Sequence, residues 1–485
     1  MASTNEEAAA LLREYGELLG LTGGDQFRAR SYEKAARSVW GYPEDIAALS
    51  GTALTKIPGV GSSVAAKIGE IRRTGTFAAL EELRAKVPPG ALQLAKVPGV
   101  GPQRALQLAR ELGVTSVSEL AQAIRQGRLR GMARLGPRTE ERILRGIAVA
   151  ASDGALRDAL RAVPPDATED DIESVLAAHV ITATGAERGS TAERGSTAQR
   201  GSTAQRGSTA QRGKTAQRGS TAERGGTAER GGTAERGAGA AGLIRTRDLR
   251  GDLHSHTDLT DGIVSLEGMI AAAGARGYEY YAVTDHAPNL VMQRMTDEKM
   301  LAQRAQLRAL ADTAGLALLH GTELNIAADG SVDWDDDFLS GFDICVASVH
   351  SSFEQDRATM TKRFITAIEN PRVNIIGHPV TRKVGRRPPV EADLDALYAA
   401  CARTGTALEI NASPDRLDLP PQHIAAARDA GVKFAIDTDA HSLADLTNMR
   451  FGVAAARFGG LTPADVINAW PLDRLEEFLR KGRSR

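Results

Sequence analysis

The spacing of hydrophobic residues divides the chain into a helical front part and a rear part of mixed helices and strands. Between residues 1 and 150, apolar residues recur every three or four positions, as in Ala8, Leu11, Leu12, Tyr15 and Leu18, which is the period of an amphipathic helix. Gly and Pro break this pattern into short segments. No alternating strand pattern occurs before about residue 243. We therefore predict an all-helical domain over 1–150, followed by a residual helical segment over 151–184.

The rear part, residues 243–485, alternates short apolar, β-branched runs with stretches of helical length. This alternation is typical of α/β proteins with parallel strands. Seven β/α units in this length predict a barrel of the (β/α)₈ type with one unit missing. The seven predicted strands are Asp252–His256, Tyr280–His286, Ala317–Ile326, Asp343–Ser351, Val373–His378, Ala407–Ala412 and Lys433–Ala440.

A six-residue repeat lies between the two parts, within a predicted linker over 185–242. The unit Thr-Ala-Glu/Gln-Arg-Gly-Ser/Gly places Arg at every sixth position from 188 to 236. The tract between Gly185 and Gly237 has no Val, Leu, Ile or aromatic residue, so it cannot bury enough surface to offset its chain entropy. We predict that it is disordered. A six-residue period could also describe a β-helix, but such a fold needs inward-facing aliphatic residues. As for function, the evenly spaced arginines could bind DNA phosphates weakly instead of serving only as a tether.

Composition and charge indicate a cytoplasmic protein with two electrostatically different parts. No apolar run approaches the about 18 residues of a membrane span, and the first residues are acidic, unlike a secretory signal. The two cysteines, Cys345 and Cys401, fit no metal-ligand spacing and no disulfide framework. Residues 1–150 carry 21 Lys and Arg against 15 Asp and Glu, whereas residues 243–485 carry 27 against 34. This asymmetry favours a polyanion-binding module joined to a metal site. If the polyanion is DNA, we expect the protein to associate with the nucleoid.

Two copies of a Pro-Gly-Val-Gly turn in the front part predict a grip on nucleic-acid backbone. Ile57–Gly61 and Val97–Gly101 each precede a predicted helix, and their glycines allow backbone N–H groups to approach a phosphate closely. An ordinary helix–helix turn is the alternative, but the repetition argues against it. A degenerate third copy, Leu135–Arg138, lies in a run of arginines. The predicted DNA-binding residues are Gly59, Val60, Gly61, Lys67, Gly99, Val100, Gly101, Arg104 and Arg138.

Residues 5–150 resemble the lyase-like and fingers subdomains of the bacterial family X DNA polymerases. The resemblance is carried by Gln26–Tyr32 with Ala35-Ala36, by both hairpins and by Arg128–Gly131. In relatives a Lys on the helix after the first hairpin attacks the aldehyde of an abasic site, and Lys67 matches that position. The resemblance therefore implies a lyase nucleophile, whose amine needs a lowered pKa. A phosphate contact is the alternative role, because a point charge suffices for binding.

The family would continue with a polymerase palm that holds two Mg(II) ions on an Asp-x-Asp pair. Residues 151–242 contain Asp170-Asp171 but no Asp-x-Asp pair, and more than half of that segment is repeat. Two-metal nucleotide transfer needs those carboxylates. We therefore expect a chain without polymerase activity.

Metal-binding residues follow the predicted strands of the rear part. His254 and His256 are two positions apart on a strand, so both imidazoles point to one face. Six of the nine histidines lie at predicted strand ends, on the face where barrel active sites form, whereas His179, His320 and His423 do not. Histidines of the core or surface would be scattered without regard to strand ends. The other strand-end groups are Asp285-His286, Gly321–Glu323, Ser348–His350, Gly377-His378 and Asp437–His441.

Residues 250–485 are similar to the polymerase and histidinol phosphatase (PHP) domain. The similarity implies a distorted (β/α)₇ barrel with up to three divalent ions. The mixed ligand set suits Mn(II), Zn(II) or Fe(II) better than Mg(II), and Mn(II) or Zn(II) are our expectation. Within it, His254, His256, Glu323 and Asp439 are the expected catalytic core. The implied metal ligands are His254, His256, Asp261, His286, Glu323, His350, His378, Asp439 and His441.

Together the two parts predict a metal-dependent phosphoesterase that acts on gapped, nicked or abasic DNA without reading sequence. The family resemblance implies a 3′–5′ exonuclease, an abasic-site endonuclease, or both, in DNA repair. A small-molecule phosphatase of the histidinol-phosphate type, tethered to a DNA-binding module, is one alternative, and a non-catalytic DNA-binding scaffold is another. Arg382-Lys383, Arg386-Arg387 and Arg294 are either contacts to a DNA strand or surface charges.

Overall fold

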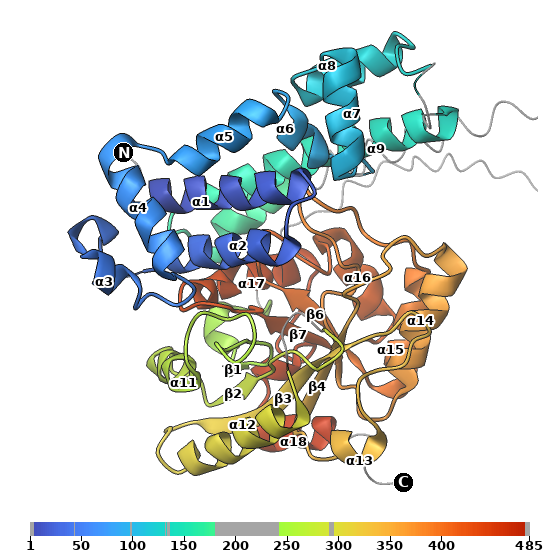
Figure 1. Ribbon diagram of the computed structural model, residues 1–485. Helices are drawn as coiled ribbons and strands as arrows, with labels where there is room; N and C mark the ends of the chain where they lie inside the picture. Colours follow the sequence, from blue (N-terminus) through green and yellow to red (C-terminus); the bar gives the residue numbers. More distant parts are fainter. Residues whose placement is uncertain are drawn as a thin grey trace, which may run out of the picture.

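The computed structural model describes residues 4–42, 44–97, 99–130, 132, 136–179, 242–290 and 295–480. Figure 1 shows a helical front domain lying across one end of a barrel. Most of the predicted linker, residues 185–241, lies outside the described residues, and so does Arg294. Among the residues that the structure describes, no helix has the length and apolar character to cross a membrane.

The front domain is helical throughout its described residues, as predicted. Helices α1 and α2 pack along each other, with the rings of Tyr15 and Tyr32 edge to face at a centroid distance of 4.7 Å. The side chain of Asp25 caps α2 by accepting from the backbone N–H groups of Phe27 and Arg28. The elements are α1 (Thr4–Leu21), α2 (Gln26–Trp40), η1 (Ile46–Ala48), α3 (Gly51–Leu54), α4 (Ser62–Thr74), α5 (Ala78–Lys86), α6 (Ala91–Ala95), α7 (Pro102–Leu112), α8 (Val117–Arg125) and α9 (Pro137–Arg161).

Helix α9 joins the front domain to the barrel, because it runs without interruption across the predicted boundary at residue 150. Ile143 belongs to the front core, whereas Leu156 and Leu160 belong to the rear core. A further helix over 169–179 adds Ile172 and Leu176 to that rear core. The described chain on both sides of the repeat therefore packs in the rear domain, since Ile244 and Leu249 lie in the same cluster.

The rear domain confirms the seven predicted β/α units. Its seven strands are all parallel and lie in sequence order from β1 to β7. A parallel bridge between Ser255 and Ala440 joins the ends of the first and last strands, so the barrel is nearly closed. The strands are β1 (Gly251–Asp252), β2 (Tyr280–Val283), β3 (Ala317–Asn325), β4 (Ile344–Ser348), β5 (Ile375–Ile376), β6 (Ala407–Asn411) and β7 (Phe434–Asp437).

Helices surround the barrel and bury the outer faces of its strands. Strand residues such as Tyr281 and Val346 have no exposed surface, which explains why the strands read as continuous apolar runs. The surrounding elements are η3 (Thr246–Asp248), α11 (Leu266–Ala275), α12 (Asp297–Leu310), α13 (Asp336–Leu339), α14 (Arg357–Glu369), α15 (Leu394–Thr404), α16 (Pro421–Asp429), η5 (Asp445–Asn448), α17 (Met449–Phe458), η6 (Ile467–Ala469) and α18 (Leu472–Leu479).

Candidate metal centre and nucleic-acid interface

All nine residues proposed as metal ligands lie at the carboxyl ends of the barrel strands. His254 and His256 follow β1, Asp261 lies further along the same segment, and Glu323 lies in β3. The other ligands follow β2, β4, β5 and β7; they are His286, His350, His378, Asp439 and His441. The bridge between Ser255 and Ala440 brings the region after β1 beside that after β7. Parallel strands thus bring together side chains that are up to 185 positions apart, as are His256 and His441, whose ring centroids lie 4.4 Å apart.

Glu323 is the central carboxylate of this cluster. Its oxygens lie 2.8 Å from His286 Nδ1, 3.1 Å from His378 Nε2 and 3.2 Å from His350 Nε2. The Nε2 atoms of His254 and His256 each lie 3.6 Å from Glu323 Oε2. A single carboxylate, 1% exposed, therefore faces five imidazoles. A carboxylate with both oxygens in such a position can be a ligand of more than one ion.

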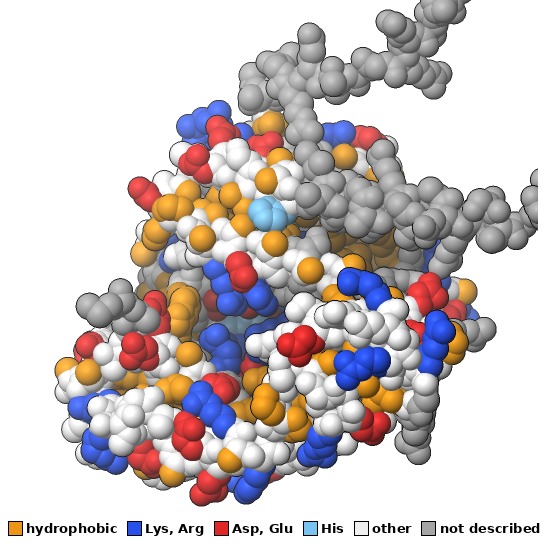
Figure 2. Space-filling view, turned by 90° about the horizontal axis from the view of Figure 1, so that it is seen from above, with side chains coloured by type: hydrophobic (Ala, Val, Ile, Leu, Met, Phe, Trp, Pro, Cys, Tyr) orange, Lys and Arg blue, Asp and Glu red, His pale blue; other side chains and the backbone are white. Residues whose placement is uncertain are grey.

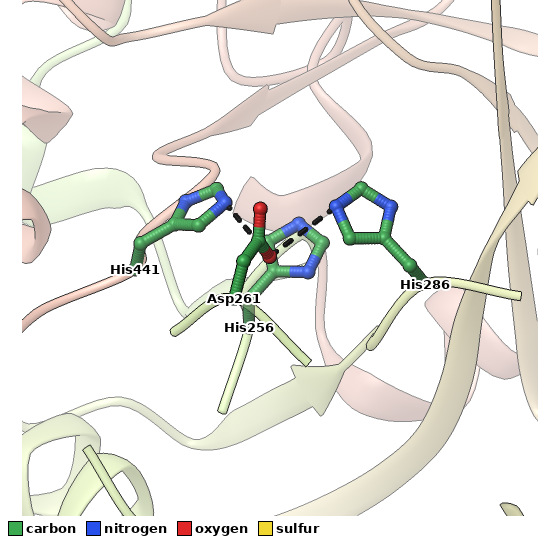
Figure 3. A group of neighbouring side chains, drawn as sticks. All are labelled: His256, Asp261, His286 and His441. Atoms are coloured by element: carbon green, nitrogen blue, oxygen red, sulfur yellow. Dashed lines mark ion pairs between the residues drawn. The ribbon is translucent and has the colours of Figure 1, made fainter. Parts of the chain in front are cut away.

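A second group is centred on Asp261, which Figure 3 shows between the rings of His441 and His286 with His256 beside them. Asp261 Oδ1 lies 3.3 Å from Nε2 of His286 and 3.3 Å from Nε2 of His441. Within this group of four, and within each of two further groups, the ligand atoms lie within 4.8 Å of one another. The two further groups are His254, His256 and Asp439, and His286, Glu323 and His350.

Several buried atoms in these groups fit a cation better than a hydrogen bond. Asp261 Oδ1 and His286 Nδ1 are buried and have no hydrogen-bond partner among the described residues, although each lies close to an atom of opposite character. The Nε2 atoms of His254 and His256 face each other at 3.2 Å. A buried polar atom without a partner costs free energy. The residues present therefore fit several divalent ions.

The electrostatics of the centre keep its carboxyl groups ionised. Burial raises the pKa of Glu323, but His350, His286 and His254 outweigh this and hold the pKa well below its usual value. Burial also raises the pKa of Asp439, but the charge of His254 outweighs this and holds the pKa well below its usual value. Burial lowers the pKa of His378 to about 3, with a further contribution from Arg416. The carboxylates are thus anionic and His378 is neutral, which are the states that bind metal ions. Burial lowers the pKa of His254 and His286, but neighbouring carboxylates outweigh this and hold it well above the usual value. A bound ion would therefore displace the protons of these two imidazoles.

Polar residues behind the ligands orient their rings. His254 Nδ1 lies 2.6 Å from Glu409 Oε1, and His350 Nδ1 lies 2.8 Å from Asn325 Oδ1. Asn411 Nδ2 donates to Asp439 Oδ2 at 3.0 Å. Such partners fix the ring tautomer and leave Nε2 free to face an ion. Sequence reasoning missed these residues, and the only signal for Glu409 is a single charge within an apolar strand.

In the front domain, the two hairpins have the geometry that the sequence predicts. Gly59 and Gly99 have φ of +78° and +82°, a region that favours glycine. Gly61 and Gly101 are the N-caps of α4 and α7, and neither helix has a side-chain cap.

The first N–H groups of both helices are therefore available to an anion. Val60 and Val100 are buried between these exposed glycines. Arg104 donates to the carbonyl of Gly99 at 2.8 Å, and the side chain of Arg138 lies outside the described residues.

Lys67 lies on α4 beside two aromatic rings. Its Nζ is 3.2 Å from Ser63 Oγ, and 6.0 Å and 5.6 Å from the ring centroids of Tyr15 and Tyr32. Burial raises the pKa of Tyr32, but hydrogen bonds with Ser63 and Lys67 outweigh this and lower it. The amine thus lies beside a serine hydroxyl and two aromatic rings.

The basic residues after β5 have different surroundings. Arg382 is buried and donates to the carbonyls of Arg416 and Leu417, so it supports a loop and faces neither DNA nor solvent. Lys383 and Arg386 are exposed. Arg416, which the sequence did not single out, places its Nε 3.4 Å from Asp439 Oδ2.

Comparison with family models matches three regions of the chain. Residues 3–77 match a helix-hairpin-helix domain, and residues 91–148 match a SAM-like helix-hairpin-helix tandem. Residues 252–413 match the PHP domain. These matches agree with the expected hairpins and metal centre.

Individual relatives extend the comparison. The chain is 30% identical to the DNA polymerase/3′-5′ exonuclease PolX of Bacillus subtilis (strain 168), over 97% of this chain and 98% of the relative. It is 31% identical to a protein described as a probable phosphatase from Edwardsiella ictaluri (strain 93-146), over 48% of this chain and 95% of the relative. The match to a solved structure described as a putative histidinol phosphatase from Listeria monocytogenes covers 40% of this chain and 97% of that chain at 15% identity, with a TM-score of 0.34.

Proposed function

The chain belongs to the PolX family, and on that premise we propose that it removes nucleotides from the 3′ ends of DNA. Its rear domain is a PHP metal-dependent phosphoesterase. The observation that carries the proposal is the convergence of five imidazoles on the single buried carboxylate of Glu323. The helix-hairpin-helix domains supply the backbone grip on gapped, nicked or abasic DNA.

The nine predicted ligands would hold up to three ions, with Mn(II) or Zn(II) as our expectation. When bound, such ions lower the pKa of a water and stabilise charge on the phosphoester. Other residues of the chain orient the metal ligands and the phosphate. Glu409 and Asn325 hold the rings of His254 and His350, and Arg416 lies beside Asp439, where a phosphate oxygen would gain a cationic partner.

We also propose that this chain has no polymerase activity. The alignment with the Bacillus relative spans 562 positions, more than the 485 residues of this chain, so the relative carries residues that this chain lacks. Residues 151–242, where a palm would follow, have no Asp-x-Asp pair. Both observations support loss of the palm.

End-labelled gapped DNA, incubated with and without Mn(II) and dNTPs, tests both proposals. We expect metal-dependent shortening from the 3′ end and no extension of the primer. Template-dependent extension of the primer would refute the proposal that this chain has no polymerase activity. Release of free phosphate from phosphomonoesters, without shortening of DNA, would favour the small-molecule phosphatase that the Edwardsiella relative suggests.

Abasic-site cleavage is a second candidate activity, favoured by the position of Lys67 between Ser63, Tyr15 and Tyr32. An amine there would attack the sugar aldehyde and form a Schiff base with loss of water. Borohydride reduction should trap the chain on abasic DNA, and Lys67→Ala should abolish trapping. Trapping that persists in this variant would exclude Lys67 as the nucleophile.

A further inference from the structure

A buried carboxylate lies behind the second group of ligands, the one centred on Asp261. Asp285 has no exposed surface, and several donors converge on it. Its Oδ1 accepts from the backbone N–H of Thr257 at 2.9 Å and from the hydroxyl of Thr260. Its Oδ2 accepts from the hydroxyl of Thr257 at 2.5 Å and from Nε2 of Gln303 at 2.6 Å. Asp285 is therefore the centre of a buried hydrogen-bond network.

The partners of this carboxylate are sequence neighbours of the ligands. Thr257 directly follows His256. Thr260 directly precedes Asp261, and the carboxylate itself belongs to the residue before His286. One side chain thus fixes the backbone beside three of the four residues whose ligand atoms lie within 4.8 Å of one another.

The fourth ligand, His441, is tied to the same segment by the backbone. Its carbonyl accepts from the N–H of Ile263 at 2.8 Å, and the N–H of His256 donates to the carbonyl of Ala440 at 2.8 Å. Between these two contacts, residues 258–261 form a turn outside any helix or strand. A turn lacks the regular hydrogen-bond ladder of a strand, so its shape depends on side-chain partners such as Asp285.

The network is also closed to water. Asp285 and Thr257 are at most 1% exposed, and Thr260 is 7% exposed. The face shown in Figure 2 exposes little histidine, although charged side chains are spread over it, which agrees with the burial of the ligand rings. Removing Asp285 would leave its donors without a replacement partner, and this is costly for buried groups.

The number of donors excludes Asp285 as a ligand. A carboxylate has about four lone-pair sites, and the hydrogen bonds of Asp285 occupy them. From these contacts we infer that Asp285 is the positioning residue for the ion of the Asp261 group. It touches no ion and sets the geometry of the residues that do. This inference rests on the proposed function, because it concerns the ions of the same centre.

The test is a titration of the metal-free full chain with Mn(II), in which free Mn(II) is measured by electron paramagnetic resonance. Residues that orient metal ligands typically contribute about 10- to 100-fold to metal affinity. In Asp285→Ala, the affinity for one ion should therefore fall at least tenfold, while the other ions stay bound. The rise in melting temperature that Mn(II) causes should also shrink, whatever the melting temperature in chelator.

The conservative variant Asp285→Asn distinguishes positioning from direct ligation. Its Oδ1 still accepts from Thr257 and Thr260. Its amide can donate to Oε1 of Gln303, which is buried without a hydrogen-bond partner among the described residues, once the Gln303 amide turns over. Mn(II) affinity should therefore stay within about threefold of the wild-type value.

A third variant, Thr260→Val, removes a single donor and keeps Asp285. Its affinity for one ion should fall about fivefold, since one hydrogen bond to a charged group is lost. This variant decides the question if Asp285→Ala does not fold.

The matched control is Asp465→Ala. Asp465 accepts from the N–H and the hydroxyl of Thr462 at 3.0 Å and 2.8 Å, the same pair of donors that Thr257 offers to Asp285. It lies at the opposite end of the barrel, because its carbonyl accepts from the N–H of Phe434, the first residue of β7. Its Mn(II) affinity should equal that of the wild-type chain.

Three results would overturn the inference and leave the nuclease function in place. They are wild-type Mn(II) affinity in Asp285→Ala or in Thr260→Val, a loss in Asp285→Asn as large as that in Asp285→Ala, and an equal loss in the control. A wild-type chain that binds no Mn(II) and does not shorten end-labelled DNA would overturn the proposed function and this inference together.

Discussion

Replacing Glu323 by Gln should separate hydrolysis from DNA binding. The amide keeps the volume of the side chain but removes the negative charge that faces five imidazoles within 3.6 Å. Glu323 is 1% exposed, so water does not replace the lost ligand. The variant should therefore bind at least one ion fewer than the wild-type chain.

The magnitude follows from the role of such an ion. A metal ion contributes several kcal/mol of charge stabilisation in the transition state, and about 1.4 kcal/mol corresponds to a tenfold change in rate. A loss of roughly 3 to 5 kcal/mol predicts a rate lower by about two to four orders of magnitude. DNA affinity should stay within about twofold, because the hairpins lie in the other domain.

Three measurements on each variant check this prediction: bound metal by mass spectrometry, nuclease rate on end-labelled DNA, and DNA affinity by fluorescence anisotropy. Glu267→Gln, an exposed position in the first turn of α11, is the control and should match the wild-type chain in all three. A Glu323→Gln chain that retains the full nuclease rate with metal in excess would show that this centre is not the catalyst.

Three further predictions follow from other parts of the molecule. Gly101→Ala adds a Cβ that meets no atom within 4 Å, so the fold should be unchanged while DNA affinity falls severalfold through blocked approach to phosphate; unchanged affinity would exclude this hairpin as the grip. Deletion of 186–237 leaves ten undescribed residues that reach about 33 Å, and should change the melting temperature little; a large fall would show that the tract is part of a folded core. Burial and Arg304 lower the pKa of His320 to about 3, so below pH 6.5 this imidazole takes up a proton in the unfolded chain but not in the folded chain. Its contribution to the free energy of unfolding should therefore drop by about 1.6 kcal/mol between pH 6.5 and 5. His320→Asn should reduce this drop in urea titrations, and an equal drop in both chains would contradict the assignment.

Sequence patterns predict the barrel well because parallel strands bury both faces and so appear as apolar runs. The ligands could be predicted for a related reason, since the carboxyl ends of such strands meet at one rim. The role of Glu409 could not be predicted, because its partner His254 is 155 positions away. A charge within an apolar strand does not reveal which residue it contacts. From the sequence Arg382 was either a DNA contact or a surface charge, yet it is buried and donates to two backbone carbonyls.

The junction between the domains shows another limit of sequence patterns. The predicted front domain ends at residue 150, but α9 continues through this boundary to Arg161. Which core receives a helical face depends on tertiary packing, and Leu156 and Leu160 pack into the barrel. Nothing local in the sequence distinguishes these leucines from those of the front core.

The path of α9 has an evolutionary consequence for the hexapeptide tract. A continuous helix of 25 residues fixes the spacing between the domains. The described residues on either side of the tract pack in the core of the barrel domain. If the tract is disordered, as its composition predicts, each doubling of its length costs only about 0.6 kcal/mol. Gain or loss of whole units by slippage at the gene level should therefore be nearly neutral for folding and for the alignment of DNA grip and metal centre. We expect the number of units to vary between close relatives more freely than any other part of the chain.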